Sequence, residues 1–157
     1  MKVLIVYDSR TGNTEKMAHA VAEGVRAERV EVEVKRVDEV LVDALPEVDG
    51  IIIGSPVYYG LPSGKIKEFL DASVKYHGKL EGKVGGAFAS SGGTHSGGET
   101  TVIALLEALL VHGMVIQGVS SRNHYGPVSV GAPDETANEA CRSLGRRVAK
   151  LVKRLHG

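Results

Sequence analysis

The chain has 157 residues, of which 43% are apolar and 24% charged, and its 19 basic and 19 acidic side chains leave no formal net charge. This length and composition predict one soluble domain over 1–157, and a neutral chain gives no electrostatic indication of a nucleic-acid partner. No apolar run reaches the ~20 residues that a membrane span needs, so we expect no membrane insertion.

Apolar runs that are typical of buried strands alternate with helical patterns along the whole chain. Residues 2–7 form the first such run, and residues 13–27 follow with apolar side chains at helical spacing. Valine alternates with charge over 30–37, which indicates a half-exposed strand near a sheet edge. The predicted strands are 2–7, 30–37, 50–54, 84–89 and 114–119, and the predicted helices are 13–27, 38–45, 62–73, 99–111 and 134–155.

The only cysteine, Cys141, lies on the apolar stripe of the last predicted helix, together with Leu144 and Val148. This position indicates a buried packing residue rather than a reactive thiol. A single cysteine cannot form an internal disulfide, which fits a reducing environment, so we expect a cytoplasmic protein.

Continuous apolar strands joined by helices predict an α/β fold, a doubly wound parallel sheet with helices on both faces. Five strands favour the order 2-1-3-4-5 over the six-stranded dinucleotide-binding order. In such a sheet, ligands bind outside the carboxyl ends of the strands, where the strand order reverses. Three loops meet that edge: loop 1 (residues 8–14), loop 2 (54–61) and loop 3 (90–98).

Loop 1 contains Ser9-Arg10-Thr11-Gly12-Asn13-Thr14 at a junction between a strand and a helix. The first N–H groups of a helix have no intrahelical partner and lie at the positive end of its dipole. Together with three hydroxyl groups they predict a phosphate site. The segment matches neither the lysine-containing nucleotide P-loop nor G-x-G-x-x-G, so a terminal monophosphate without metal fits it best.

Loop 2 contains Pro56-Val57-Tyr58-Tyr59-Gly60, in which two adjacent tyrosines could offer a flat face to a flat ligand. Loop 3 is rich in glycine, so its backbone N–H groups can approach the polar edge of a ring closely. A serine–histidine nucleophile at His95 and Ser96 is disfavoured because sequence neighbours rarely point at each other and no G-x-S-x-G elbow is present. The six histidines show no paired ligand spacing, so we expect no metal site.

A response-regulator receiver domain shares this strand order and is the main alternative fold assignment. It needs an acidic pair after the first strand, an aspartate at the end of the third and a lysine after the fifth. Here Asp8 stands alone, Gly54 and Ser55 end the third strand, and no lysine follows the fifth. The sequence therefore excludes a receiver.

Ser9-x-Thr11-Gly12-x-Thr14 after the first strand resembles the FMN-phosphate signature of flavodoxins. Other segments are similar to one branch, the WrbA-type NAD(P)H:quinone oxidoreductases, and follow its order along nearly the whole chain. They are Met17–Gly24, Gly54–Pro56, Gly60–Asp71, Ser90–Gly93, His112–Ile116 and Tyr125–Gly126.

The resemblance implies FMN as the cofactor, with its phosphate held by loop 1 and its isoalloxazine held between loops 2 and 3. The FMN-binding residues that follow are Ser9, Arg10, Thr11, Gly12, Asn13, Thr14, Pro56, Val57, Tyr58, Tyr59, Gly60, Ser90, Ser91, Gly92, Gly93, Thr94 and His95. It also places His112 near the ring as the candidate catalytic residue, although a histidine before a glycine fits a helix C-cap equally well.

Two redox functions follow from the resemblance: an electron carrier acting on a redox partner protein, and a reductase taking electrons from NAD(P)H to a small quinone. The chain is shorter than the quinone reductases between its second and third strands and after Asp71, where that branch builds its tetramer. This favours the carrier and leaves a homo-oligomer, dimer or tetramer, open. A non-redox regulatory or interaction protein that keeps the fold is the remote alternative.

Overall fold

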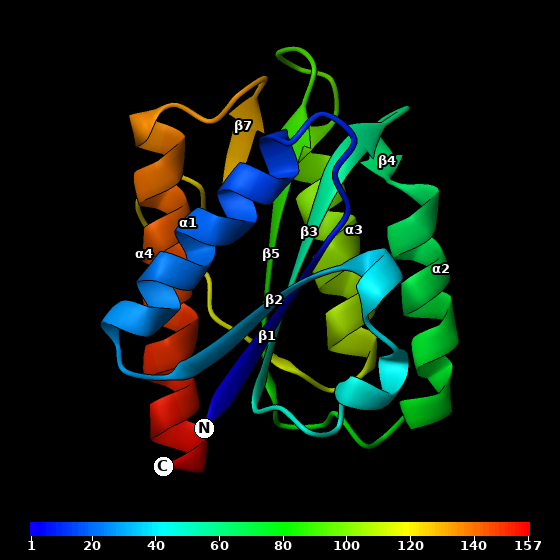
Figure 1. Cartoon of the computed structure of the whole chain (residues 1–157), viewed down its shortest axis with the longest axis vertical. Coiled ribbons are helices and arrows are strands. Elements are labelled where there is room, and N and C mark those ends of the chain that lie inside the picture. The colour runs from blue at the N-terminus through cyan, green and yellow to red at the C-terminus, as the bar shows by residue number, and fades with distance from the viewer.

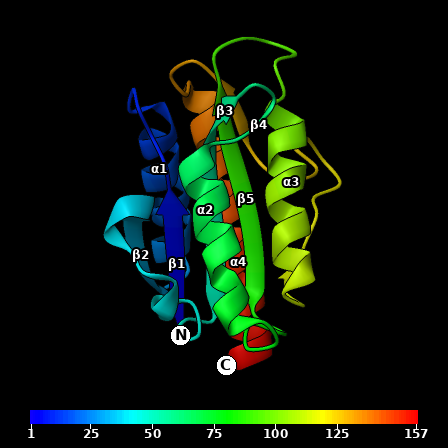
Figure 2. The ribbon, with the colours of Figure 1, turned by 90° about the vertical axis from the view of Figure 1, so that its right-hand side faces the viewer.

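The apolar runs of the sequence form the strands of a mainly parallel sheet that lies between two layers of helices (Figures 1 and 2). The computed structural model describes all 157 residues. Its strands are β1 (Lys2–Tyr7), β2 (Glu31–Arg36), β3 (Gly50–Tyr58), β4 (Leu61–Pro62), β5 (Val84–Ser91), β6 (Val115–Ile116) and β7 (Val128–Val130).

The helices begin and end close to the residues that the sequence predicts. They are α1 (Asn13–Ala27), α2 (Gly64–Ala72), α3 (Gly98–Val111) and α4 (Glu135–His156), with short 3-10 turns η1 (Val37–Glu39), η2 (Val42–Ala44) and η3 (Ser73–Tyr76). Ser63 and Asp134 cap α2 and α4 by accepting backbone N–H groups. The predicted helix 38–45 is wrong, because two 3-10 turns occupy that segment. No helix combines the length and apolar character that crossing a membrane requires.

The sheet runs in the order β2-β1-β3-β5-β6, which confirms the predicted doubly wound arrangement. β4 folds back antiparallel on the end of β3. The fifth strand departs from the prediction, because its apolar run ends at Ile116 before a polar, glycine-containing segment. β6 pairs with the start of β5, the chain then leaves the sheet, and β7 pairs with the end of β5.

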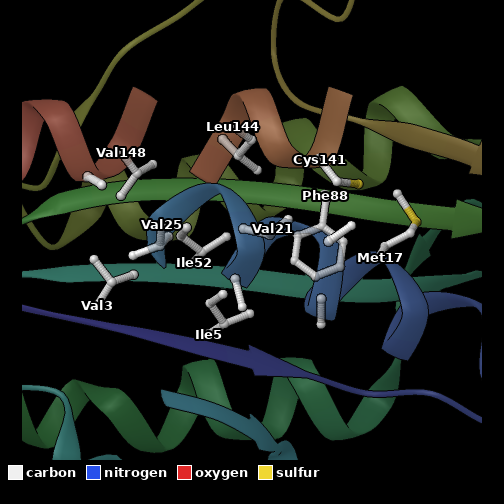
Figure 3. Close-up of a cluster of buried hydrophobic side chains, with 14 of the residues drawn as sticks. Val3, Ile5, Met17, Val21, Val25, Ile52, Phe88, Cys141, Leu144 and Val148 are labelled. Carbon is white, nitrogen blue, oxygen red and sulfur yellow. The ribbon is translucent and has the colours of Figure 1, made fainter. Parts of the chain in front are cut away.

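Each face of the sheet carries its own apolar core. α1 and α4 cover one face over a cluster of 18 buried residues, part of which is drawn in Figure 3. α2 and α3 cover the other face over a cluster of 17. Cys141 is fully buried in the first cluster, as predicted, and burial raises the pKa of its thiol to about 12. The thiol therefore stays protonated and serves packing.

Two glycines bring the backbones of α1 and α4 into direct contact. A Cβ atom added to Gly24 would lie 2.0 Å from the carbonyl oxygen of Arg142. One added to Gly145 would lie 2.0 Å from the carbonyl oxygen of Val21. Both distances are far below van der Waals contact, so any larger residue at either position would force the helices apart.

This contact predicts a large stability difference between two Gly→Ala substitutions. Gly145→Ala should lower the free energy of unfolding by about 2–3 kcal/mol, because the backbone of α1 cannot yield as a side chain can. Gly64→Ala is the matched control, since a Cβ there meets nothing within 4 Å and the residue is already helical. It should change stability by less than ~0.5 kcal/mol or raise it slightly. Urea unfolding measures both, and equal effects would refute the close crossing.

Candidate functional site

Loops 1, 2 and 3 lie together at one edge of the sheet, the upper edge in Figure 1, and contact one another. The hydroxyl groups of Thr14 and Ser90 form a buried hydrogen bond of 2.8 Å that joins loop 1 to the end of β5. A Cβ on Gly97 would lie 2.6 Å from Cα of Gly60, so loops 2 and 3 touch backbone to backbone. Parallel strands thus assemble one site from segments far apart in the sequence.

Loop 1 leaves the N-terminus of α1 open to a ligand. Gly12 adopts a left-handed conformation at the N-cap position (φ 89°), and no side chain caps the helix. Ser9 Oγ instead accepts a hydrogen bond from the Gly12 N–H (3.1 Å), which tightens the loop before the helix begins. The side chain of Thr11 is exposed beside these uncapped N–H groups. The donor set of backbone N–H and hydroxyl groups therefore fits a phosphate.

Loop 2 is a tight hairpin that presents a tyrosine ring to solvent. β3 continues to Tyr58, and the pairs Val57–Pro62 and Tyr58–Leu61 close a two-residue turn at Tyr59 and Gly60. Both turn residues have positive φ angles, 51° and 77°, as a type I′ hairpin turn requires. A left-handed tyrosine is uncommon and strained, and Tyr59 is fully exposed. Strain of this kind often accompanies a functional role.

Loop 3 offers backbone groups instead of bulky side chains. A Cβ on Gly92 or Gly93 would meet no atom within 4 Å, so open space borders the backbone there. Ser91 Oγ donates to the carbonyl of Gly93 (3.0 Å) and fixes the start of the loop. His95 is a second left-handed residue, with φ 56°. The space beside this backbone, facing the tyrosine hairpin, suits the polar edge of a ring.

Tyr7 connects the end of β1 to the first turn of α1. Its hydroxyl donates to Glu15 Oε1 (3.1 Å). Burial first, and then the neighbouring Glu15 carboxylate, raise the pKa of Tyr7 to about 12. The hydroxyl stays protonated at physiological pH, and its hydrogen bond to Glu15 ties the end of β1 to the first turn of α1.

Two cationic residues beside loop 1 were missed by the sequence analysis. Arg36, at the end of β2, donates from its guanidinium to the carbonyl of Ser9 (3.1 Å). Lys65, in the first turn of α2, pairs with Asp38 at 2.7 Å. With Arg10, whose guanidinium lies 5.8 Å from the centre of the Tyr58 ring, they line a hollow of about 620 Å³. The sequence indicates that the charged residues of β2 face solvent at the sheet edge. Only the fold shows that Arg36 lies beside loop 1.

The structure does not bring His112 together with the three loops. His112 follows the last residue of α3, whereas loop 3 precedes the first, so the helix separates them by roughly 20 Å. The imidazole is buried and lies 2.7 Å from Ser73 Oγ. Within one chain it occupies the helix C-cap position, and a place near a flavin ring is not supported by this geometry.

The comparisons with known proteins agree with this arrangement. A family model described as a flavodoxin domain matches residues 4–110. A flavodoxin of Aquifex aeolicus is 44% identical over 160 aligned residues, covering 96% of this chain and 86% of the relative. A protein of Archaeoglobus fulgidus named NAD(P)H dehydrogenase (quinone) is 34% identical, and the alignment covers 98% of this chain and 98% of that protein.

Solved structures show the same similarity. A flavodoxin from the domain Archaea superposes with a TM-score of 0.83 at 30% identity, covering 98% of this chain and 99% of that one. A flavodoxin described as WrbA-like, from Agrobacterium tumefaciens, gives a TM-score of 0.83 at 29% identity, with 98% of each chain covered. The fold, the three assembled loops and the matched relatives lead to one conclusion: the chain belongs to the flavodoxin family.

Proposed function

We propose that the chain is an FMN-binding electron carrier. Family membership implies FMN. One observation carries the assignment to these residues: the Thr14–Ser90 hydrogen bond joins the uncapped N-terminus of α1 to the end of β5, where loop 3 begins. A phosphate on loop 1 and a ring beside loop 3 would thus be held by one connected structure.

Each loop has a defined task in this proposal. The first N–H groups of α1 and the hydroxyls of loop 1 bind the phosphate. Tyr58 and Tyr59 pack against the ring, and the backbone N–H groups of loop 3 hydrogen-bond its polar edge. Bound FMN supplies one- and two-electron chemistry, and the protein sets its position and electrostatic surroundings.

A specific observation favours a second candidate, an NAD(P)H:quinone reductase. The hollow beside loops 1 and 2 carries Arg10, Arg36 and Lys65, and positive charge attracts the phosphates of a dinucleotide. Relatives named for this activity also cover almost the whole chain. The carrier has priority because the flavodoxin relative is the more similar of the two in sequence.

Reduction of the FMN-loaded protein separates the two candidates. A carrier should be reduced in two resolved one-electron steps during stepwise titration and should oxidise NAD(P)H only slowly. A reductase should take up two electrons together and turn over NADPH rapidly with benzoquinone. Absorbance spectra during the titration and a steady-state assay give both results, and failure to bind added FMN would refute both candidates.

Thr11→Val tests the phosphate site with little disturbance to the fold. The substitution removes an exposed hydroxyl while keeping the shape of the side chain. It should weaken FMN binding by about 1–3 kcal/mol, which is roughly 5- to 150-fold, because a charge-assisted hydrogen bond is lost. Riboflavin, which lacks the phosphate, is the matched control ligand and should bind both proteins alike. Equal weakening of FMN and riboflavin would contradict the phosphate role of loop 1.

Tyr59→Gly tests the ring contact while relieving the hairpin of strain. Glycine adopts positive φ readily, so the free energy of unfolding should stay the same or increase by up to ~1 kcal/mol. FMN and riboflavin should both bind less tightly, by about threefold to tenfold, because an aromatic contact worth roughly 0.5–1.5 kcal/mol is lost. Fluorescence titration and thermal unfolding measure the two effects. Unchanged flavin affinity would show that Tyr59 does not cover the ring.

A further inference from the structure

A second hollow of about 470 Å³ lies between α2 and α3, on the sheet face that Figure 2 presents. Its walls are mainly apolar and come from β4, α2, η3 and α3. The apolar side chains are Leu61, Leu70, Val74, Ala104, Ala108 and Val111. Pockets of this size and character are typical of small-molecule sites. We refer to this hollow as the α2/α3 groove.

A buried hydrogen-bonded chain defines the protonation of His112, which lines the groove. Ser73 Oγ lies 2.6 Å from the carbonyl of Leu70 and 2.7 Å from His112 Nε2. A carbonyl only accepts, so the single hydroxyl proton of Ser73 goes to Leu70. Ser73 Oγ must then accept from His112, which places the imidazole proton on Nε2. Nδ1 is left with a free lone pair.

Nδ1 of His112 has no hydrogen-bond partner in the chain, although only 9% of the residue is exposed. Burial, together with the neighbouring His77, lowers the pKa of His112 from its ordinary value of 6.5. The ring is therefore neutral at pH 7 and keeps Nδ1 as an acceptor. An unsatisfied buried acceptor is unfavourable, so a bound donor would stabilise the protein.

We propose that the α2/α3 groove binds a small neutral aromatic molecule whose hydroxyl donates to Nδ1 of His112. The apolar walls favour a ring, which loses little conformational freedom on binding. Lys67 and Asp71 at the rim neutralise each other in a 2.7 Å ion pair, while Glu107 has no cationic partner. The rim therefore disfavours an anionic ligand. A phenol fits all three features: its hydroxyl can donate to Nδ1, its ring can pack against the apolar walls, and it carries no negative charge.

The ligand must move side chains at the closed end of the groove, because Nδ1 itself is shielded from solvent. Val74 is 70% exposed and His77 is also exposed, so each can rotate outward without leaving a packed core. The site shares no residue with the three flavin loops apart from Leu61, which ends loop 2. The proposal therefore does not rest on the proposed electron-transfer function.

Nuclear magnetic resonance with matched probes tests the proposal on FMN-loaded, ¹⁵N-labelled protein at pH 7.5. The probes are 4-ethylphenol and its methyl ether, 4-ethylanisole, which lacks the donor. The phenol should shift the His112 Nδ1 resonance and the amides of α2 and α3 that line the groove. It should bind at least about fivefold more tightly than the ether, the effect of one hydrogen bond.

Two variants make the outcome decisive. In His112→Phe a ring of similar shape fills the space of the imidazole but carries no hydrogen-bond acceptor, so the phenol should bind only as weakly as the ether. Ala108→Leu fills the groove from its half-buried wall and should abolish binding of both probes. If thermal unfolding shows that His112→Phe does not fold, Ala108→Leu and the comparison of the two probes still test the proposal.

Three results would overturn the proposal. Equal affinity for phenol and ether would show that Nδ1 does not accept a hydrogen bond from the ligand. Chemical-shift changes confined to other surfaces would show that the ligand does not bind in the groove. Groove resonances that change with protein concentration and resist the phenol would show that a second copy of the chain occupies this face instead.

Discussion

The contact between α1 and α4 at Gly24 and Gly145 is the constraint on which the rest of the structure depends. Backbone touches backbone there, so α1 can neither slide nor tilt without a clash. The hydrogen bond between Thr14 and Ser90 also fixes the first turn of α1. The helix end that faces the flavin phosphate in our proposal is therefore fixed from two directions before any ligand arrives. Preorganisation of this kind favours binding because little freedom is then lost.

Much of the fold and the position of the candidate site can be predicted from the sequence. Ile51-Ile52-Ile53 and the run at 84–89 are typical of central parallel strands, and strand–helix alternation leaves few topologies. Once the strand order is known, loops 1, 2 and 3 must share one edge, whatever their residues. Gly12 suits the left-handed turn before α1, whereas the left-handed Tyr59 runs against the backbone preference of its residue type and was not predicted.

Other features depend on contacts that have no sequence signal. After the fifth strand ends at Ile116, the chain returns to the sheet so closely that a Cβ on Gly126 would lie 2.2 Å from the carbonyl oxygen of Ala87. The resemblance left His112 open between a place near the ring and a helix C-cap, and the structure places it at the C-cap of α3, at the other end of that helix from loop 3. In the sequence, Arg36 is one of several charged residues of β2 with nothing to distinguish it. Only the structure shows that its guanidinium donates a hydrogen bond to the carbonyl of Ser9 in loop 1.

The break between β6 and β7 has a consequence for how copies of this protein can meet. β6 pairs with the start of β5 and β7 with its end, so the middle of β5 has no strand partner on that side. The segment 117–127 covers this part of the edge, where Gly126 packs against it. At the other side, the outer strand β2 is short and alternates valine with Glu31, Glu33 and Lys35. Covered or charged edges resist pairing with a strand from another molecule. Pairing of β2 with a strand of another molecule is therefore disfavoured, and we expect copies of the protein to meet through helices or loops.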